Sequence, residues 1–274
     1  MVKMVRDTAA KGDLKLDRTA QRRLLPDPKF DFLIVGAGRG GISLIAALLD
    51  AHSDVEVGFE LHAQECLMGK VLSGPGRDEL HQRVNTFIAA CNTEAQRSPC
   101  RLRGNRITTE QIFGLEDHNA ANPKAQVDVF EVFFNVYFGQ QKIIFILRDD
   151  RACFSSKVRR AGRSYESAAE QWRYSVQCFR FLRERHGNNL CIRFEDLLFE
   201  PRKTLQRVSD FLGIPYQEAM LAGVSNQKLS SQYQHGKLDT AKAAPIDLPP
   251  AHLESIQAEL NYCGYIGAKR PMAD

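Results

Sequence analysis

Apolar and polar positions along the chain follow two alternating patterns. Short runs rich in β-branched and other apolar residues are typical of buried strands. They cover residues 30–35, Val55–Phe59, Lys142–Leu147 and 189–194. Helical spacing of apolar residues predicts helices at 43–51, 80–90, 168–184 and 204–212, and the apolar, aromatic residues 127–138 predict a further buried helix. Because strands and helices alternate, we predict a three-layer α/β/α fold around a central parallel sheet.

Residues 101–111 fit neither pattern. The segment reads RLRGNRITTEQ, with charged residues on both sides of Gly104. We predict a loop here, which leads through Ile107 into a helix with Thr108 as its N-cap.

The excess charge of the chain lies at its N-terminus. The whole chain carries 37 Lys and Arg against 33 Asp and Glu, and residues 1–29 hold eight basic residues and four aspartates. This segment therefore accounts for the whole net charge of +4. The neutral remainder argues against nucleic-acid binding by the globular part. We expect a mobile basic arm at residues 1–29 and a single α/β domain at residues 30–274.

Cysteine usage and hydropathy indicate the environment of the protein. Seven cysteines without a C-x-x-C pair argue against a disulfide framework or a zinc site, and they fit a reducing compartment. No apolar run approaches the roughly 18–20 residues that a membrane span needs. From the sequence we expect a cytoplasmic protein that uses no metal and binds no membrane. The oligomeric state stays open.

A glycine-rich segment, GAGRGGIS, directly follows the first strand and opens the first helix. Such a turn presents backbone N–H groups to a phosphate at a helix N-terminus. Gly36, Gly38 and Gly41 spell the G-x-G-x-x-G motif of dinucleotide-binding proteins, and Glu56 lies at the spacing of its ribose contact. The segment also fits a P-loop, except that Ile42 stands where the Lys belongs. We predict a phosphate-bearing ligand and keep both motifs open.

Further segments follow in order along the chain. The strand KIIFIL ends at Arg148, and Ser156 follows eight residues later. IRFEDLLFEPRKTLQRVSDFLGIP joins a strand to an acidic turn, a proline, a helix and Phe-Leu-Gly, and Gly264-Tyr265 lies near the C-terminus. With the glycine loop, this ordered set resembles the sulfotransferases that use 3′-phosphoadenosine-5′-phosphosulfate (PAPS), over about residues 30–266. The resemblance implies transfer of a sulfonate from PAPS to a hydroxyl or amine of a carbohydrate or small-metabolite acceptor.

The resemblance also implies which residues bind the donor. The glycine loop would hold the 5′-phosphosulfate, Arg148 and Ser156 the 3′-phosphate, and Phe194 the adenine by stacking. The donor-binding set is Gly38, Arg39, Gly40, Gly41, Ile42, Ser43, Arg148, Ser156 and Phe194. Lys237 and Lys242 lie where relatives carry basic residues near the 3′-phosphate, and their part is left open.

For catalysis the resemblance implies in-line transfer, in which a carboxylate takes the proton of the acceptor. Glu60 follows the second strand at the place of that carboxylate, and His62 is the alternative base. Arg39 and Arg106 would neutralise charge on the departing phosphate and the sulfonate. Without a catalytic role, Arg106 would pair with Glu110, four residues further on.

Two other functions stay open. Ile42 replaces a Thr of the related loops and removes a hydroxyl donor, which costs about 1.5–3 kcal/mol for a bond to a charged group. Asp150 replaces the Pro that commonly follows Arg-Asp. These departures make a PAP-binding or other nucleotide-binding protein without turnover one alternative. The glycine motif supports the other, a Rossmann-type dinucleotide oxidoreductase, which would give Arg148 and Ser156 no role.

Overall fold

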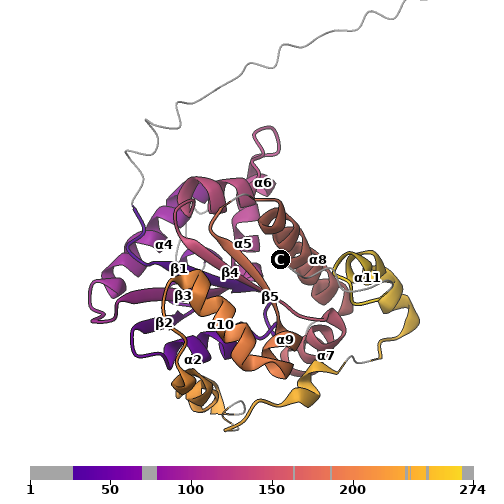
Figure 1. The fold of residues 1–274 in the computed structure, drawn as a ribbon. Helices are drawn as coiled ribbons and strands as arrows, with labels where there is room; N and C mark the ends of the chain where they lie inside the picture. Colours follow the sequence, from indigo (N-terminus) through magenta and orange to yellow (C-terminus); the bar gives the residue numbers. More distant parts are fainter. Residues whose placement is uncertain are drawn as a thin grey trace, which may run out of the picture.

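The computed structural model describes residues 27–69, 79–162, 164–185, 187–231, 234, 236–244 and 247–266, except for the side chains of residues 155, 156 and 159–161. A five-stranded sheet with the order β2-β3-β1-β4-β5 lies at its centre. The strands are β1 (Phe32–Gly36), β2 (Val55–Phe59), β3 (Leu102–Thr108), β4 (Lys142–Leu147) and β5 (Asn189–Arg193). Every neighbouring pair is parallel, so the carboxyl ends of the five strands lie at one edge (Figure 1).

The sheet is apolar on both faces, as expected for parallel strands covered by helices. Along β1, Phe32 and Ile34 belong to one core cluster, and Leu33 and Val35 belong to the other. The first cluster includes α2 (Ile42–Asp50), α9 (Phe194–Phe199), α10 (Pro201–Leu212) and η3 (Glu218–Ser225). The second includes α4 (Leu80–Ala95), α5 (Thr109–Phe113), η2 (Glu131–Tyr137), α8 (Tyr165–Glu184) and α11 (Pro250–Tyr262). The predicted three-layer α/β/α fold with a P-loop-like turn is confirmed.

Shorter elements connect these layers. They are α3 (Ala63–Cys66), η1 (Gly114–Glu116), α6 (Asp117–Ala121), α7 (Asp150–Ala161) and η5 (Thr240–Ala243). Among the helices that the structure describes, none is long and apolar enough to cross a bilayer. Residues 1–26 of the N-terminal arm lie outside the described residues, so the arm and its boundary with the domain stay predictions.

The prediction of a loop at residues 101–111 is wrong, because Leu102–Thr108 forms the strand β3, which lies between β1 and β2 in the sheet. Gly104 lies opposite Phe32, and a Cβ at this glycine would lie 2.3 Å from the Phe32 ring. The glycine thus makes room for a core side chain and does not mark a turn. Asn105 is buried and Arg106 is mostly buried. Both side chains can occupy these positions because they bond protein groups instead of water.

Three further predictions concern the ends of helices and strands and one buried helix. Thr108 does cap α5, in a reciprocal capping box with Gln111. The helix expected at 127–138 is present, but its greater part is the π-helix η2. Phe194, expected as the last residue of a strand, instead begins α9.

Asp150, the first residue of α7, is fully buried. Neither of its carboxylate oxygens has a hydrogen-bond partner among the groups that the structure describes. Burial raises the pKa of Asp150 well above its usual value of 3.8, and it outweighs the opposing attraction of Lys157. A carboxyl group whose pKa is raised by folding stabilises the fold at low pH. That contribution is lost as the pH rises through the raised pKa.

We therefore predict that Asp150→Asn changes the pH dependence of stability. The free energy of unfolding of the variant, relative to the wild type, should rise between about pH 4 and about pH 8, because Asn has no proton to lose at this buried position. Urea unfolding across this range measures the difference, and Asp210→Asn at an exposed position of α10 is the control. A difference that stays constant with pH would contradict the prediction.

Candidate active site

The carboxyl edge of the sheet brings together residues that are far apart in the sequence. The glycine loop follows β1, Glu60 follows β2, and Arg106 lies near the end of β3. Arg148 follows β4, and Phe194 follows β5. Ligands of open parallel sheets bind at this edge, where the strand order reverses, here around β1. These sequence-predicted residues therefore share the edge at which a ligand site is expected.

The loop between β1 and α2 has the geometry of an anion-binding turn. Gly41, the N-cap of α2, has a φ of 95°, and a Cβ there would lie 2.2 Å from the ring of Phe194. Glycine is thus required at this position. The N–H groups of Ile42 and Ser43 precede the first hydrogen bond of α2, which Leu44 donates to the Gly41 carbonyl, so they are placed to bind an anion. Ile42 is 3% exposed and packs into the core, so it can offer a ligand its backbone but not its side chain.

Arg148 connects the two predicted phosphate sites. Its Nη1 donates to the carbonyl of Arg39 at 2.8 Å, and its Nη2 donates to the carbonyl of Lys242 at 2.7 Å. The guanidinium carbon lies 4.3 Å from the centroid of the Phe194 ring, in a cation–π contact. Arg39 and Arg148 therefore belong to one site. The side chain of Ser156, in α7, lies outside the described residues.

Glu60 and Arg106 form an ion pair across the ends of β2 and β3. The distance from Glu60 Oε1 to Arg106 Nη1 is 2.5 Å, and the side chains are 23% and 14% exposed. Gln64 Nε2 donates to the other carboxylate oxygen at 3.1 Å. Burial lowers the pKa of Arg106, and the charge of Glu60 opposes this lowering. The alternative pairing of Arg106 with Glu110 is wrong, because Arg106 reaches the corner after β2 instead.

Glu110 lies against the glycine loop. The Gly38 N–H donates to both of its carboxylate oxygens, at 3.0 and 2.9 Å. Lys157, which is buried, donates to the same carboxylate at 2.6 Å and to Gln171 at 3.1 Å. Glu110 and Lys157 were not among the site residues predicted from the sequence, although both lie beside the glycine loop. The sequence carried no clear signal for them, because the residues before Thr108 lack the apolar pattern of a strand.

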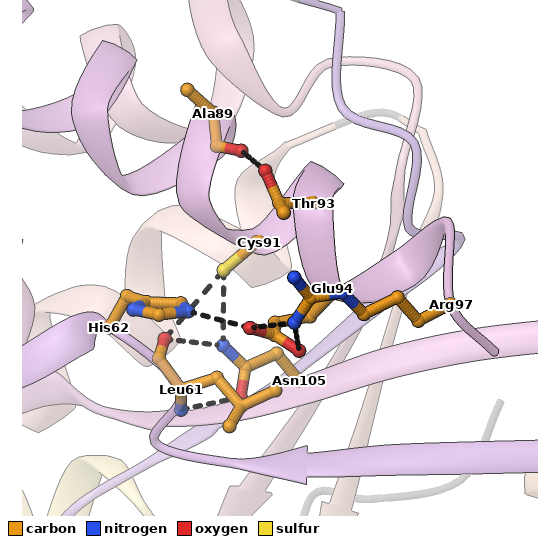
Figure 2. A network of polar contacts seen from close by, with 8 residues as sticks. All are labelled: Leu61, His62, Ala89, Cys91, Thr93, Glu94, Arg97 and Asn105. Atoms are coloured by element: carbon orange, nitrogen blue, oxygen red, sulfur yellow. Dashed lines mark hydrogen bonds and ion pairs between the residues drawn. The ribbon is translucent and has the colours of Figure 1, made fainter.

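The corner between β2 and α3 has a rare backbone conformation, and Figure 2 shows Leu61 and His62 of this corner beside Asn105. Glu60 and His62 have φ values of 59° and 57°, which residues other than glycine seldom adopt. The Asn105 amide bonds the backbone of Leu61 between them. His62 Nε2 lies 3.7 Å from Glu94 Oε1 on α4. Of the two candidate bases, Glu60 is therefore the one that contacts a predicted catalytic cation.

A cavity of about 190 Å³ opens beside the ends of β4 and β5. Its lining consists of Asp149, Arg151, Arg193, Glu195, Ala243, Gly264 and Tyr265. Glu195 accepts hydrogen bonds from the Asp149 N–H at 3.0 Å and from the Tyr265 hydroxyl at 3.1 Å. Burial nevertheless raises the pKa of Glu195. These contacts attach the C-terminal Gly264-Tyr265 segment to the site, whereas Lys237 is exposed on the segment before η5.

The chain resembles sulfotransferases in sequence. A family model described as "Sulfotransferase family" matches residues 31–218. Protein-tyrosine sulfotransferase 1 of Danio rerio is 27% identical over 216 residues, which cover 69% of this chain and 54% of the relative. The matched regions span 39% to 54% of the length of the curated relatives.

Two solved structures share the fold. The sulfotransferase domain from the curacin biosynthetic pathway superposes with a TM-score of 0.62 at 19% identity, covering 88% of this chain and 99% of that domain. The sulfotransferase domain from the Synechococcus PCC 7002 olefin synthase superposes with a TM-score of 0.61 at 25% identity, covering 86% and 95%. The family match at 31–218 spans all five strands, the glycine loop and the charged strand ends described above. The chain belongs to the sulfotransferase family.

Proposed function

We propose that the chain transfers a sulfonate from PAPS to a hydroxyl or amine of an acceptor. The observation that carries this proposal is the hydrogen bond from Arg148 to the Arg39 carbonyl, which joins two anion-binding elements at one edge of the sheet. PAPS has a 5′-phosphosulfate and a 3′-phosphate on one adenosine, and therefore needs two such elements. The carboxylate of Glu110 supports the fit, because an anion already accepts the N–H of Gly38.

The donor-binding roles follow from this placement. The backbone of the glycine loop, with Arg39 and Ser43, would hold the 5′-phosphosulfate. Arg148 and Ser156 would bind the 3′-phosphate, the first as a bidentate donor and the second through its hydroxyl. Phe194 would line the adenine side of the site. The proposed binding set remains Gly38, Arg39, Gly40, Gly41, Ile42, Ser43, Arg148, Ser156 and Phe194.

The transfer follows an in-line course in this proposal. The carboxylate of Glu60 takes the proton of the acceptor while the acceptor oxygen or nitrogen forms its bond to sulfur. The bond from sulfur to the bridging oxygen of the 5′-phosphate breaks, and Arg39 neutralises the charge that the departing phosphate gains. Arg106, held beside Glu60 by their ion pair, attracts the sulfonate oxygens. We assign no metal, because PAPS has no β/γ-phosphate pair for a metal to bridge.

For the acceptor we propose a carbohydrate or a small metabolite. A tyrosine side chain is the second candidate, and the similarity to the Danio rerio protein-tyrosine sulfotransferase favours it. A screen with radiolabelled PAPS against sugars, simple phenols and tyrosine peptides would separate these acceptor classes.

Titration calorimetry with PAP, NAD⁺ and ATP tests the donor assignment. Preferential binding of PAP is the expected result. Preference for NAD⁺ would favour the dinucleotide oxidoreductase. Binding of PAP without transfer to any acceptor in a broad screen would favour a nucleotide-binding protein without turnover.

Arg148→Ala should weaken PAP binding by more than about 30-fold, or about 2 kcal/mol, because the 3′-phosphate loses its cation. Calorimetry measures the change in Kd. Arg207→Ala, on the exposed face of α10, is the control and should bind PAP as the wild type does. Unchanged binding by Arg148→Ala would refute the assignment of the 3′-phosphate site.

Glu60→Gln should leave PAP binding intact and lower kcat by about 10²–10⁴-fold, because the amide cannot take the proton of the acceptor. Initial rates with labelled PAPS measure the loss. Glu56→Gln, on the same strand β2, is the matched control. Wild-type turnover by Glu60→Gln would remove Glu60 from the mechanism.

Glu110→Gln should tighten PAP binding by about tenfold, equivalent to about 1.4 kcal/mol. A neutral amide competes less well than a carboxylate for the N–H of Gly38, and Lys157 then loses its charged partner and attracts the donor. Glu116→Gln, whose carboxylate instead bonds Tyr174 and Asn119, is the control. Weaker binding by Glu110→Gln would mean that Glu110 supports the loop and does not compete with the donor.

A further inference from the structure

Glu60 lies in a backbone conformation that its residue type does not favour. Both Glu60 and His62 have positive φ values, and Leu61 lies between them. L-residues are strained in this region, and the strain persists only where the surrounding structure holds it. Contacts from outside the corner must therefore keep Glu60 in place.

The side chain of Asn105 provides these contacts (Figure 2). Its Oδ1 accepts the Leu61 N–H at 3.2 Å, and its Nδ2 donates to the Leu61 carbonyl at 3.0 Å. Asn105 is 2% exposed, so water does not compete for these bonds. The thiol of Cys91 donates to the same carbonyl at 3.6 Å, and burial raises the pKa of Cys91 to about 12, which keeps this donor protonated.

Consecutive residues of β3 hold different parts of the corner. Side chains alternate between the two faces of a strand, so Asn105 and Arg106 point to opposite sides of the sheet. Asn105 bonds the backbone of Leu61, whereas Arg106 bonds the carboxylate of Glu60 and accepts the Glu60 N–H at its carbonyl, at 3.0 Å. Gly58 allows the chain to fold back, because a Cβ there would lie 2.4 Å from Leu61 Cδ1. One strand thus sets both the backbone and the side chain of Glu60.

We infer that Asn105 is a positioning residue for sulfonate transfer. The inference rests on the proposed function, in which Glu60 takes the proton of the acceptor. Asn105 acts through Leu61, and it holds Glu60 in the left-handed conformation that pairs its carboxylate with Arg106. When the protein already holds the base in its reactive geometry, the activation free energy does not include the entropy lost in ordering the base.

The matched pair Asn105→Leu and Asn119→Leu tests this role. Leucine has the same branched shape, although it is larger, and it makes neither hydrogen bond, so in Asn105→Leu we expect kcat to fall by about 10- to 100-fold, with the Kd for PAP within about twofold of the wild type. Asn119 makes the same two bonds to the backbone of Val127, at 2.8 and 2.9 Å, away from the corner. Asn119→Leu should lower the Tm and leave kcat unchanged. Similar losses of Tm in both variants, with kcat unchanged in Asn105→Leu, would overturn the inference.

A second variant separates positioning from folding. Glycine adopts a positive φ without strain, so His62→Gly in the Asn105→Leu background should raise kcat by about threefold or more. Loss of turnover in His62→Gly alone would make His62 the base and overturn the inference.

The inference and the proposed function can fail separately. If the wild-type protein binds PAP but transfers no sulfonate, the proposed function fails. Hydrogen exchange at the Leu61 amide still tests the contact itself. It should be about tenfold faster or more in Asn105→Leu than in the wild type, and an unchanged rate would show that Asn105 does not hold the corner.

Discussion

The parallel pairing of β1 with β3 and β4 is the constraint on which the rest of the site depends. Its register places Gly36 opposite both Thr108 and Ile146, so the glycine loop leaves the sheet level with the start of α5 and just before Arg148. A Cβ at Gly36 would lie 2.7 Å from the Ile146 carbonyl oxygen, which makes glycine necessary at this close approach. Arg148 then lies within hydrogen-bond distance of the loop carbonyl. The pairing of the strands therefore brings together the glycine loop and Arg148, the two elements to which we assign the phosphates of the donor.

The same edge carries carboxylates that are already paired with cations. Glu60 is bound to Arg106, and Glu110 is bound to Lys157 while it also accepts the N–H of Gly38. These side chains are between 5% and 23% exposed, so bulk water screens their interactions only in part. In the proposed function, the donor would therefore meet cations that are already oriented, and it would replace the Glu110 carboxylate at the Gly38 N–H. Such preorganisation is what a reaction that moves negative charge from sulfur to phosphate requires.

The sequence was sufficient to predict those elements whose pattern lies within one short segment of the chain. Apolar runs identified β2 and β4 with their observed bounds, and the glycine loop was placed correctly between β1 and α2. The sequence was insufficient to predict β3. Asn105 and Arg106 are polar residues at strand positions where the pattern of a buried strand requires apolar residues. Their partners Leu61 and Glu60 lie 44 and 46 residues away, and Glu110 lies 72 residues from Gly38. The polar residues that position the site are the ones that made β3 resemble a loop.

Ile42, which stands in place of a Thr, affects the loop and not the pair of Glu60 and Arg106. Its side chain is buried in the cluster between α2 and the sheet, and burial of each methylene there contributes about 0.8 kcal/mol. The loop has therefore exchanged one hydroxyl donor for core packing, while the backbone N–H groups at the start of α2 are unaffected. Loss of this hydroxyl donor would weaken binding of PAPS. The Glu60–Arg106 pair, to which the chemistry is assigned, lies at other strand ends and is intact. This separation favours a turnover-competent enzyme with a weakened loop contact over a remnant that only binds nucleotide.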